Sequence, residues 1–145
     1  MDLRHITETY AVAPQITAED ASTLAAAGFT HVICNRPDTE VTPDLQADAI
    51  RAAVEAAGLL FILNPVTHAG MTPENIRQQQ DIMAKEGAKV LAYCRSGTRS
   101  TFLWGLAVAE NHRPDEILAA AAQAGYDLSP LQPYLQAQAQ ARSGE

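Results

Sequence analysis

The chain has 145 residues, of which 47% are hydrophobic and 19% charged, and this composition is typical of a single soluble globular domain spanning residues 1–145. The formal net charge of −7 argues against nucleic acid or an anionic membrane surface as a partner. The first residues contain no apolar signal core and no apolar run is long enough to span a membrane, so we expect a cytoplasmic protein. The two cysteines, Cys34 and Cys94, match neither a disulfide framework nor a zinc site, and we expect no metal or cofactor.

Short apolar runs alternate with helical patterns along the chain. Weak alternation over residues 3–13 predicts two short strands or one bent hairpin. Buried strands are predicted at 29–34, 59–63 and 90–93. Helices are predicted at about 17–27, 42–57, 72–86, 101–110, 114–124 and from 129 onward, with fraying after residue 136. This order predicts an α/β fold in which a small, mostly parallel sheet is flanked by helices.

One stretch, residues 89–101, carries the clearest chemical signal. The strand ends at Cys94, a turn containing Gly97 follows, and a helical pattern starts at Thr101. A strand, a tight loop and a helix start turn backbone N–H groups toward one point and form an anion site. A thiolate held there beside the Arg99 guanidinium is expected to be nucleophilic at neutral pH. Cys94 alone would fit a buried structural cysteine, but the six residues after it are polar, which favours a cysteine-dependent enzyme acting on a small anion.

Three predicted strands end in loops that we expect to converge, because ligands of open α/β sheets lie beyond the carboxyl ends of the strands. These loops begin at Cys34, Asn64 and Cys94. In the first of them, Arg36 has two interpretations that the sequence leaves open. It is either a substrate contact or one half of a surface pair with Asp38. The helix after the third loop carries Trp104, which we expect to lie in the core.

The loop Cys94–Arg99 resembles the active-site loops of two families. Rhodanese-type sulfurtransferases carry the six-residue form Cys-Arg-x-Gly-x-Arg, whereas protein tyrosine and dual-specificity phosphatases have five residues between Cys and Arg, followed by Ser or Thr. Only four residues intervene here. The wider chain resembles the phosphatase-like domain of beta-lactamase hydrolase-like proteins. That resemblance runs from Ile16 through the loops at residues 35–38, 65 and 94–100 to residues 124–128, and it implies a protein tyrosine phosphatase-like, dual-specificity phosphatase-like α/β fold with a loop of rhodanese length.

The two chemistries differ in their need for a general acid. Hydrolysis of a phosphomonoester expels an alkoxide or phenoxide and profits from one, which phosphatases supply as an Asp in a loop before the cysteine. The matching stretch, residues 64–71, contains no carboxylate, although His68 could substitute or Asp38 could reach in. Sulfur transfer releases sulfite or a thiolate and needs little acid. We therefore expect a sulfurtransferase that carries sulfane sulfur from thiosulfate or a persulfide on Cys94 to a thiol acceptor.

Two alternatives remain open at this point: a phosphatase that forms a phosphocysteine intermediate, and a redox or anion sensor without turnover. In the sulfurtransferase interpretation Cys94 is the nucleophile, Arg99 offers two parallel donors to an anion, and the Ser100 hydroxyl hydrogen-bonds the sulfur. The backbone N–H groups of residues 95–100 stabilise the sulfur anion, and Arg95 steers anions at the mouth. The remaining residues expected to contact substrate are Ser96, Gly97, Thr98, Arg36 and His68.

Cys34 has two interpretations. It is either a small buried strand residue or, as its resemblance to the strand-end cysteine of some dual-specificity-like phosphatases implies, a thiol that resolves oxidised or persulfidated Cys94.

Overall fold

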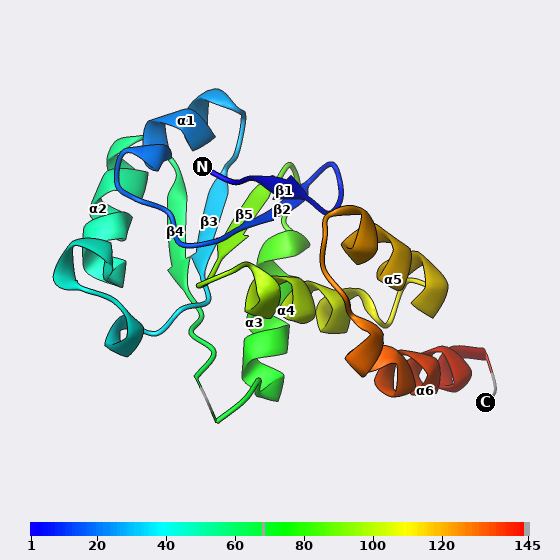
Figure 1. The fold of residues 1–145 in the computed structure, drawn as a ribbon. Coiled ribbons are helices and arrows are strands. Elements are labelled where there is room, and N and C mark those ends of the chain that lie inside the picture. The colour runs from blue at the N-terminus through cyan, green and yellow to red at the C-terminus, as the bar shows by residue number, and fades with distance from the viewer. Residues whose placement is uncertain (68, 144–145) are drawn as a thin grey trace.

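The structure, a computed structural model, describes residues 1–67 and 69–143 (Figure 1). Its strands are β1 (Arg4–His5), β2 (Tyr10–Ala13), β3 (His31–Cys34), β4 (Leu60–Leu63) and β5 (Val90–Tyr93). Its α-helices are α1 (Asp20–Ala26), α2 (Ala47–Ala56), α3 (Pro73–Met83), α4 (Thr98–Val108), α5 (Pro114–Gln123) and α6 (Gln132–Ser143). Short 3₁₀ helices are η1 (Asp38–Glu40), η2 (Pro43–Leu45) and η3 (Ser129–Leu131).

The sheet has the strand order β1-β2-β5-β3-β4. β1 pairs with β2 as an antiparallel hairpin, whereas β2, β5, β3 and β4 are parallel to one another. The α/β fold with a mostly parallel sheet flanked by helices is therefore confirmed, as is the hairpin over residues 3–13. Because the register sets Cys34 opposite Tyr93 and Leu63, the loops after β3, β4 and β5 leave the same edge of the sheet.

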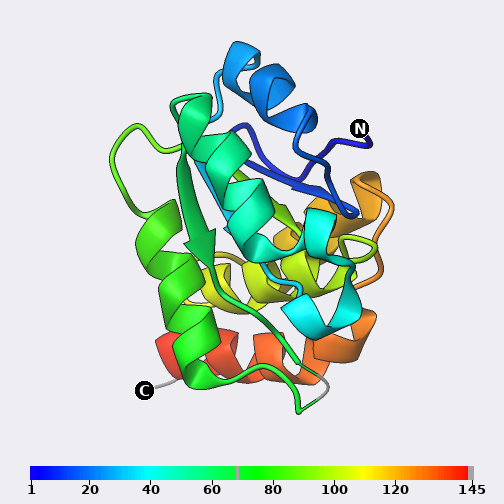
Figure 2. The ribbon, with the colours of Figure 1, turned by 90° about the vertical axis from the view of Figure 1, so that its left-hand side faces the viewer.

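Helices cover both faces of this sheet (Figures 1 and 2). α1 and α2 pack on one face, over a core that includes Leu24, Ile50 and Leu91. α3, α4, α5 and α6 lie on the other face, over a core that includes Trp104 and Ile117. Successive strand residues point to opposite faces. The central strand β5 is therefore buried on both sides, which explains its unbroken apolar sequence.

Several helices differ from the sequence prediction at their ends. The predicted helix 42–57 is split into η2 and α2, because Gln46 is extended (φ −71°, ψ 163°). The chain after residue 136, predicted to fray, continues as α6, and its Arg142 donates to the His112 carbonyl at 3.2 Å. In each case a tertiary contact or a local backbone break overrides the residue pattern.

The helix after the cysteine loop begins at Thr98, three residues earlier than predicted. Gly97 is its N-cap with φ 91°, and the Thr101 N–H donates to the Gly97 carbonyl at 3.0 Å. The first turn is polar, so the apolar periodicity starts only at Thr101. This early start places Arg99 and Ser100 inside the first turn of α4 and not in the loop.

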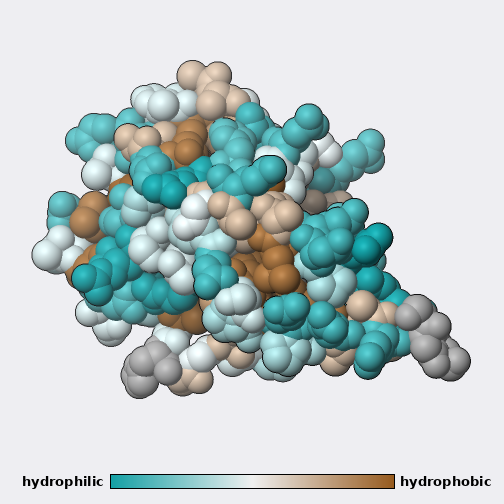
Figure 3. Space-filling model, turned by 45° about the vertical axis from the view of Figure 1, so that its right-hand side comes forward, coloured by the Kyte–Doolittle hydropathy of each residue, from teal (hydrophilic) through white to brown (hydrophobic). Residues whose placement is uncertain are grey.

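No helix among residues 1–67 and 69–143 is long and apolar enough to cross a membrane. The face in Figure 3 is mostly hydrophilic, with apolar side chains exposed in a patch near its middle.

Candidate active site

Cys94 lies at the bottom of the loop between β5 and α4 and is 1% exposed. The Gly97 N–H donates to its Sγ atom at 3.1 Å. The Gly97 carbonyl in turn accepts the Thr101 N–H at 3.0 Å and the Thr101 hydroxyl at 2.8 Å. In addition, the first backbone N–H groups of a helix such as α4 have no partner within the helix. The loop therefore directs donors at the sulfur and at any anion bound above it.

Arg99 is held in place by Glu40 and by the Val66 carbonyl. Its Nη1 donates to Glu40 Oε2 at 2.9 Å and to the Val66 carbonyl at 2.8 Å, and its Nη2 donates to Glu40 Oε1 at 2.8 Å. The pKa of Arg99 is raised first by the hydrogen bond to Glu40 and, to a smaller extent, by Cys94. Three of the five guanidinium N–H donors are thus committed to the protein, which fixes the plane of the group and leaves the others for a ligand.

Glu40 was not singled out from the sequence, yet it joins two arginines at the site. Arg36 donates from Nε to Glu40 Oε1 at 3.1 Å and from Nη1 to Gln15 Oε1 at 3.1 Å. The Arg99 guanidinium, and after it Arg36, hold the pKa of the Glu40 carboxyl below its usual value, although partial burial opposes them. Glu40 is therefore ionised at neutral pH, which makes it a clamp for Arg99 and a poor general acid.

Arg36 does form an ion pair in this loop, but with a different partner from the one expected, and its contact with substrate stays a prediction. Arg36 pairs with Glu40 and not with Asp38, because Asp38 Oδ1 accepts the Ala47 N–H at 2.7 Å at the start of α2. Asp38 therefore does not reach toward Cys94, and the suggestion that it could supply an acid there is wrong. The other suggested acid, His68, lies outside the described residues.

Ser100 belongs to a buried polar network and does not hydrogen-bond the sulfur. Its hydroxyl donates to Asn35 Oδ1 at 2.9 Å, so the expected hydrogen bond from Ser100 to Cys94 is absent from the described structure. Asn35 and Gln79 pair through both amides at 3.2 Å, and the Gln79 Oε1 atom also accepts from Asn64 at 2.8 Å. Because all four side chains are at most 1% exposed, this network locks the ends of β3 and β4 to α3 and α4.

Tyr126 braces the cysteine loop from outside. Its hydroxyl donates to the Ser96 carbonyl at 2.9 Å. A Cβ atom at Gly97 would lie 2.2 Å from the Tyr126 hydroxyl oxygen. Arg4 lies 5.7 Å from the centre of the phenol ring and donates to the Ala124 carbonyl at 2.9 Å. Position 97 therefore requires glycine for its positive φ and for the space that the phenol occupies.

The other predicted residues lie around this centre. Arg95, Ser96 and Thr98 are exposed at the mouth, and the Ser96 and Thr98 hydroxyls are 2.9 Å apart. Cys34 is buried beneath the loop, where its thiol contacts the Arg36 carbonyl at 3.2 Å. Burial raises the pKa of the Cys34 thiol, so it is protonated at neutral pH. Both cysteines are free.

The three loops converge as predicted. The Asn35 N–H donates to the Tyr93 carbonyl at 2.8 Å, the Asn64 N–H to the Cys34 carbonyl at 2.9 Å, and the Val66 N–H to the Asn35 carbonyl at 3.0 Å. Within the described ranges, no group of three or more His, Cys, Asp or Glu side chains could hold a metal ion.

Sequence reasoning missed four residues that shape the site: Asn35, Glu40, Gln79 and Tyr126. Glu40 had a usable signal, since it follows Arg36 by four residues in a polar loop that leaves a strand end. Gln79 lies on the buried side of α3, and the mostly polar sequence of this helix gave no signal that would single it out. Tyr126 is 30 residues from Ser96, and only the path of the chain after α5 brings them together.

A cysteine below a glycine turn, an arginine in the first turn of the next helix and a parallel sheet define a phosphatase-like cysteine-loop domain. The chain belongs to the family of phosphatase-like domains of beta-lactamase hydrolase-like proteins, whose model matches residues 2–111.

Two relatives share sequence with most of the chain. It is 31% identical over 141 residues to the beta-lactamase hydrolase-like protein of Xylella fastidiosa, covering 96% of this chain and 33% of that protein. It is 33% identical over 108 residues to the Agrobacterium fabrum protein of the same name, covering 74% of this chain and 25% of that protein. The chain thus spans a third or less of the length of these curated relatives.

Solved structures share the fold. A Neisseria meningitidis protein provisionally assigned as a phosphatase superposes with a TM-score of 0.80 at 33% identity, covering 95% of this chain and 99% of that one. PTPMT1 superposes with a TM-score of 0.75 at 17% identity, covering 98% of each chain. These likenesses confirm the phosphatase-like fold. They give no support to the sulfurtransferase that the sequence analysis placed first, and they favour the phosphatase that it placed second.

Proposed function

We propose that this domain is a cysteine-dependent phosphatase for small phosphomonoesters with good leaving groups. The observation that carries the proposal is the Gly97 N–H on Cys94 Sγ together with the fixed guanidinium of Arg99 in the first turn of α4. Family membership and the phosphatase-like fold support it. The acidic surface of the chain disfavours large polyanionic substrates.

In this mechanism the Cys94 thiolate attacks phosphorus, the P–O bond to the leaving group breaks, and the leaving oxygen departs with the bonding pair. Backbone N–H groups of the first turn of α4 and the free donors of Arg99 stabilise the equatorial oxygens in the transition state. Water then attacks the phosphocysteine, which releases inorganic phosphate and regenerates the thiolate.

The choice of leaving group follows from the state of Glu40. It is the carboxylate that the described residues place against Arg99, and its lowered pKa keeps it ionised. Because the described residues place no proton donor there, an aryl phosphate, whose leaving group departs as a stabilised phenoxide, is a better substrate than an alkyl phosphate.

The test compares 4-nitrophenyl phosphate with a simple alkyl phosphate, using wild type and the Cys94→Ser variant. We expect phosphate release from the aryl ester only, and none from the variant. Thr23→Ser, at an exposed position of α1, is the control and is expected to keep the wild-type rate. Absence of Cys94-dependent phosphate release from either ester would overturn the proposal.

Sulfur transfer is the second candidate function, and two observations favour it. Four residues, not five, separate Cys94 from Arg99, and the Asp38 carboxylate that might have served as an acid caps α2 instead. In that chemistry the Cys94 thiolate attacks the outer sulfur of thiosulfate, sulfite leaves, and a thiol acceptor later removes the sulfur as its own persulfide. Intact-protein mass spectrometry after thiosulfate would then show a gain of about 32 mass units on wild type and none on Cys94→Ser. Rapid aryl phosphate hydrolysis without this adduct would exclude sulfur transfer and support the phosphatase function.

The redox role of Cys34 remains a proposal. Cys34 lies at the end of β3, beside the strand that leads into Cys94. Oxidation of the Cys94 thiolate by a peroxide gives a sulfenic acid and water or an alcohol, and attack by Cys34 would form a disulfide and release water. The raised pKa of the Cys34 thiol slows this second step near neutral pH.

A further inference from the structure

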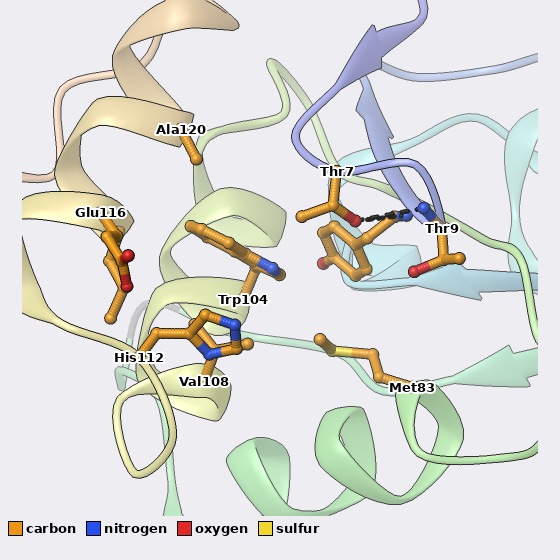
Figure 4. Close-up of a pocket in the computed structure, with 10 residues that line it drawn as sticks. Thr7, Thr9, Met83, Trp104, Val108, His112, Glu116 and Ala120 are labelled. Atoms are coloured by element: carbon orange, nitrogen blue, oxygen red, sulfur yellow. Dashed lines mark hydrogen bonds between the residues drawn. The ribbon is translucent and has the colours of Figure 1, made fainter.

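A cavity lies at the opposite end of the sheet from Cys94. It has a volume of about 350 Å³ and is bounded by the β1–β2 turn, α3, α4 and α5 (Figure 4). The Thr9 carbonyl at its edge accepts the N–H of Val90, the first residue of β5, whereas Cys94 follows the last residue of that strand. A molecule in this cavity is therefore not the substrate of Cys94.

The walls of the cavity favour an aromatic occupant. Trp104 and Tyr10 contribute aromatic rings, Met83 a thioether, and Ile117 and Val108 branched aliphatic surface. Aromatic rings pack well against other rings and against the sulfur of methionine. The volume lies at the lower end of the range of small-molecule pockets, which fits a ligand of one or two fused rings.

The indole N–H of Trp104 supplies the specific polar contact. Trp104 is 3% exposed, and its indole nitrogen has no hydrogen-bond partner among the described residues. Figure 4 shows this nitrogen on the edge of the ring that faces the cavity. This nitrogen is not among the fully buried polar atoms of the described residues, so it is open to the cavity and can donate to a ligand that carries an acceptor.

The charge at the rim limits the ligand further. Glu116 and His112 lie together at one end of the cavity, and Thr7 and Thr9 at the other (Figure 4). The Glu116 carboxylate accepts the Arg113 N–H at 3.3 Å, but no salt bridge neutralises it among the described residues. A negatively charged ligand would be repelled by this carboxylate and by the net charge of −7.

We propose that this cavity is a binding site for a planar aromatic molecule that carries a hydrogen-bond acceptor and no negative charge. The acceptor binds the Trp104 indole N–H, and the ligand ring packs against the accessible edges of Trp104 and Tyr10, which are 3% and 1% exposed. The site also touches the buried network, because the Tyr10 hydroxyl donates to the Ser100 carbonyl at 2.8 Å and accepts from Gln79 at 3.1 Å. This inference does not depend on the reaction at Cys94.

The experiment uses isoquinoline, a neutral two-ring molecule with one acceptor nitrogen, and the full chain labelled with ¹⁵N. Trp104 is the only tryptophan, so its indole N–H gives a single resonance that reports directly from the cavity. We expect this resonance to shift saturably, with a Kd on the order of 1 mM for a ligand of about ten non-hydrogen atoms. Isoquinoline-5-sulfonate, which adds a negative charge, should bind at least about tenfold more weakly.

Two variants in α5 locate the effect. Ala120 lines the cavity and is half-buried, so Ala120→Leu should fill the space and weaken isoquinoline binding by at least about tenfold. Ala119, its exposed neighbour, does not line the cavity, and Ala119→Leu should bind like wild type. Leucine is a good helix former at either position. Equal binding by Ala120→Leu and wild type, equal binding of the sulfonate, or no shift of the indole resonance would overturn the proposal.

Discussion

Replacing Gly97 by alanine tests how tightly the cysteine loop is built. Gly97 has φ 91°, and an L-residue in this left-handed conformation costs about 1–2 kcal/mol. The new Cβ atom would also lie 2.2 Å from the Tyr126 hydroxyl oxygen and 2.9 Å from Cζ. The phenol must therefore move and give up its hydrogen bond to the Ser96 carbonyl, which contributes about 1 kcal/mol. We expect Gly97→Ala to lower the free energy of unfolding by about 2–3 kcal/mol.

Gly58 provides a matched control for this substitution. Its φ is also 91°, but no atom lies within 4 Å of a Cβ atom built there. Gly58→Ala should therefore cost only the backbone term of about 1–2 kcal/mol. Urea denaturation measures both losses in the free energy of unfolding. The midpoint temperature of thermal unfolding should fall by roughly 2–4 °C for each kcal/mol lost in a chain of this size.

A double variant isolates the contribution of the phenol. In a Tyr126→Ala background the excess cost of Gly97→Ala over Gly58→Ala should disappear, because no side chain then opposes the new methyl group. Gly97→Ala should also abolish aryl phosphatase activity, since the Gly97 N–H points at the sulfur, whereas Gly58→Ala should retain it. Equal destabilisation by the two alanine substitutions, or full activity of Gly97→Ala, would refute the reasoning.

Three further predictions concern the residues around the loop. Glu40→Gln should lower kcat/KM for an aryl phosphate about tenfold, because the amide no longer balances the charge of Arg99. In wild type, the Glu40 carboxylate, whose pKa is lowered in the folded state, should stabilise the fold above its ordinary pKa, and this effect should be lost as the pH falls through the lowered pKa. If the free energy of unfolding of Glu40→Gln, measured with urea, falls with acid as it does in wild type, this prediction is wrong. Gln79→Leu should cost about 2–4 kcal/mol by leaving buried amides without partners, and exposed Gln78→Leu less than about 0.5 kcal/mol, so similar denaturation midpoints would count against the network. Mild peroxide should give a disulfide between Cys34 and the nucleophile in non-reducing peptide maps, and recovery of Cys34→Ser as readily as wild type would exclude that role.

Local sequence was enough to predict the fold class and the centre of the site. The apolar run that ends at Cys94 has to be a buried strand, and Gly97 is a residue that can make the left-handed turn before a helix. Strands alternating with helices impose parallel pairing, and parallel strands bring the loops after β3, β4 and β5 to one edge. These inferences depend on backbone geometry and on patterns a few residues long, so they hold without knowledge of side-chain packing.

Tertiary structure decided how the side chains at that edge are used. The Ser100 hydroxyl faces Asn35 and not the sulfur, because α4 begins at Thr98 and the buried amide of Asn35 lies within reach. Tyr126 and Glu40 meet the loop from distant positions, and the choice of Glu40 over Asp38 as the partner of an arginine depends on where α2 starts. Such contacts join residues 30 to 65 positions apart, and no spacing rule links residues so far separated. They form because buried polar groups must find partners in the folded chain, and only the packed structure determines which partners are near.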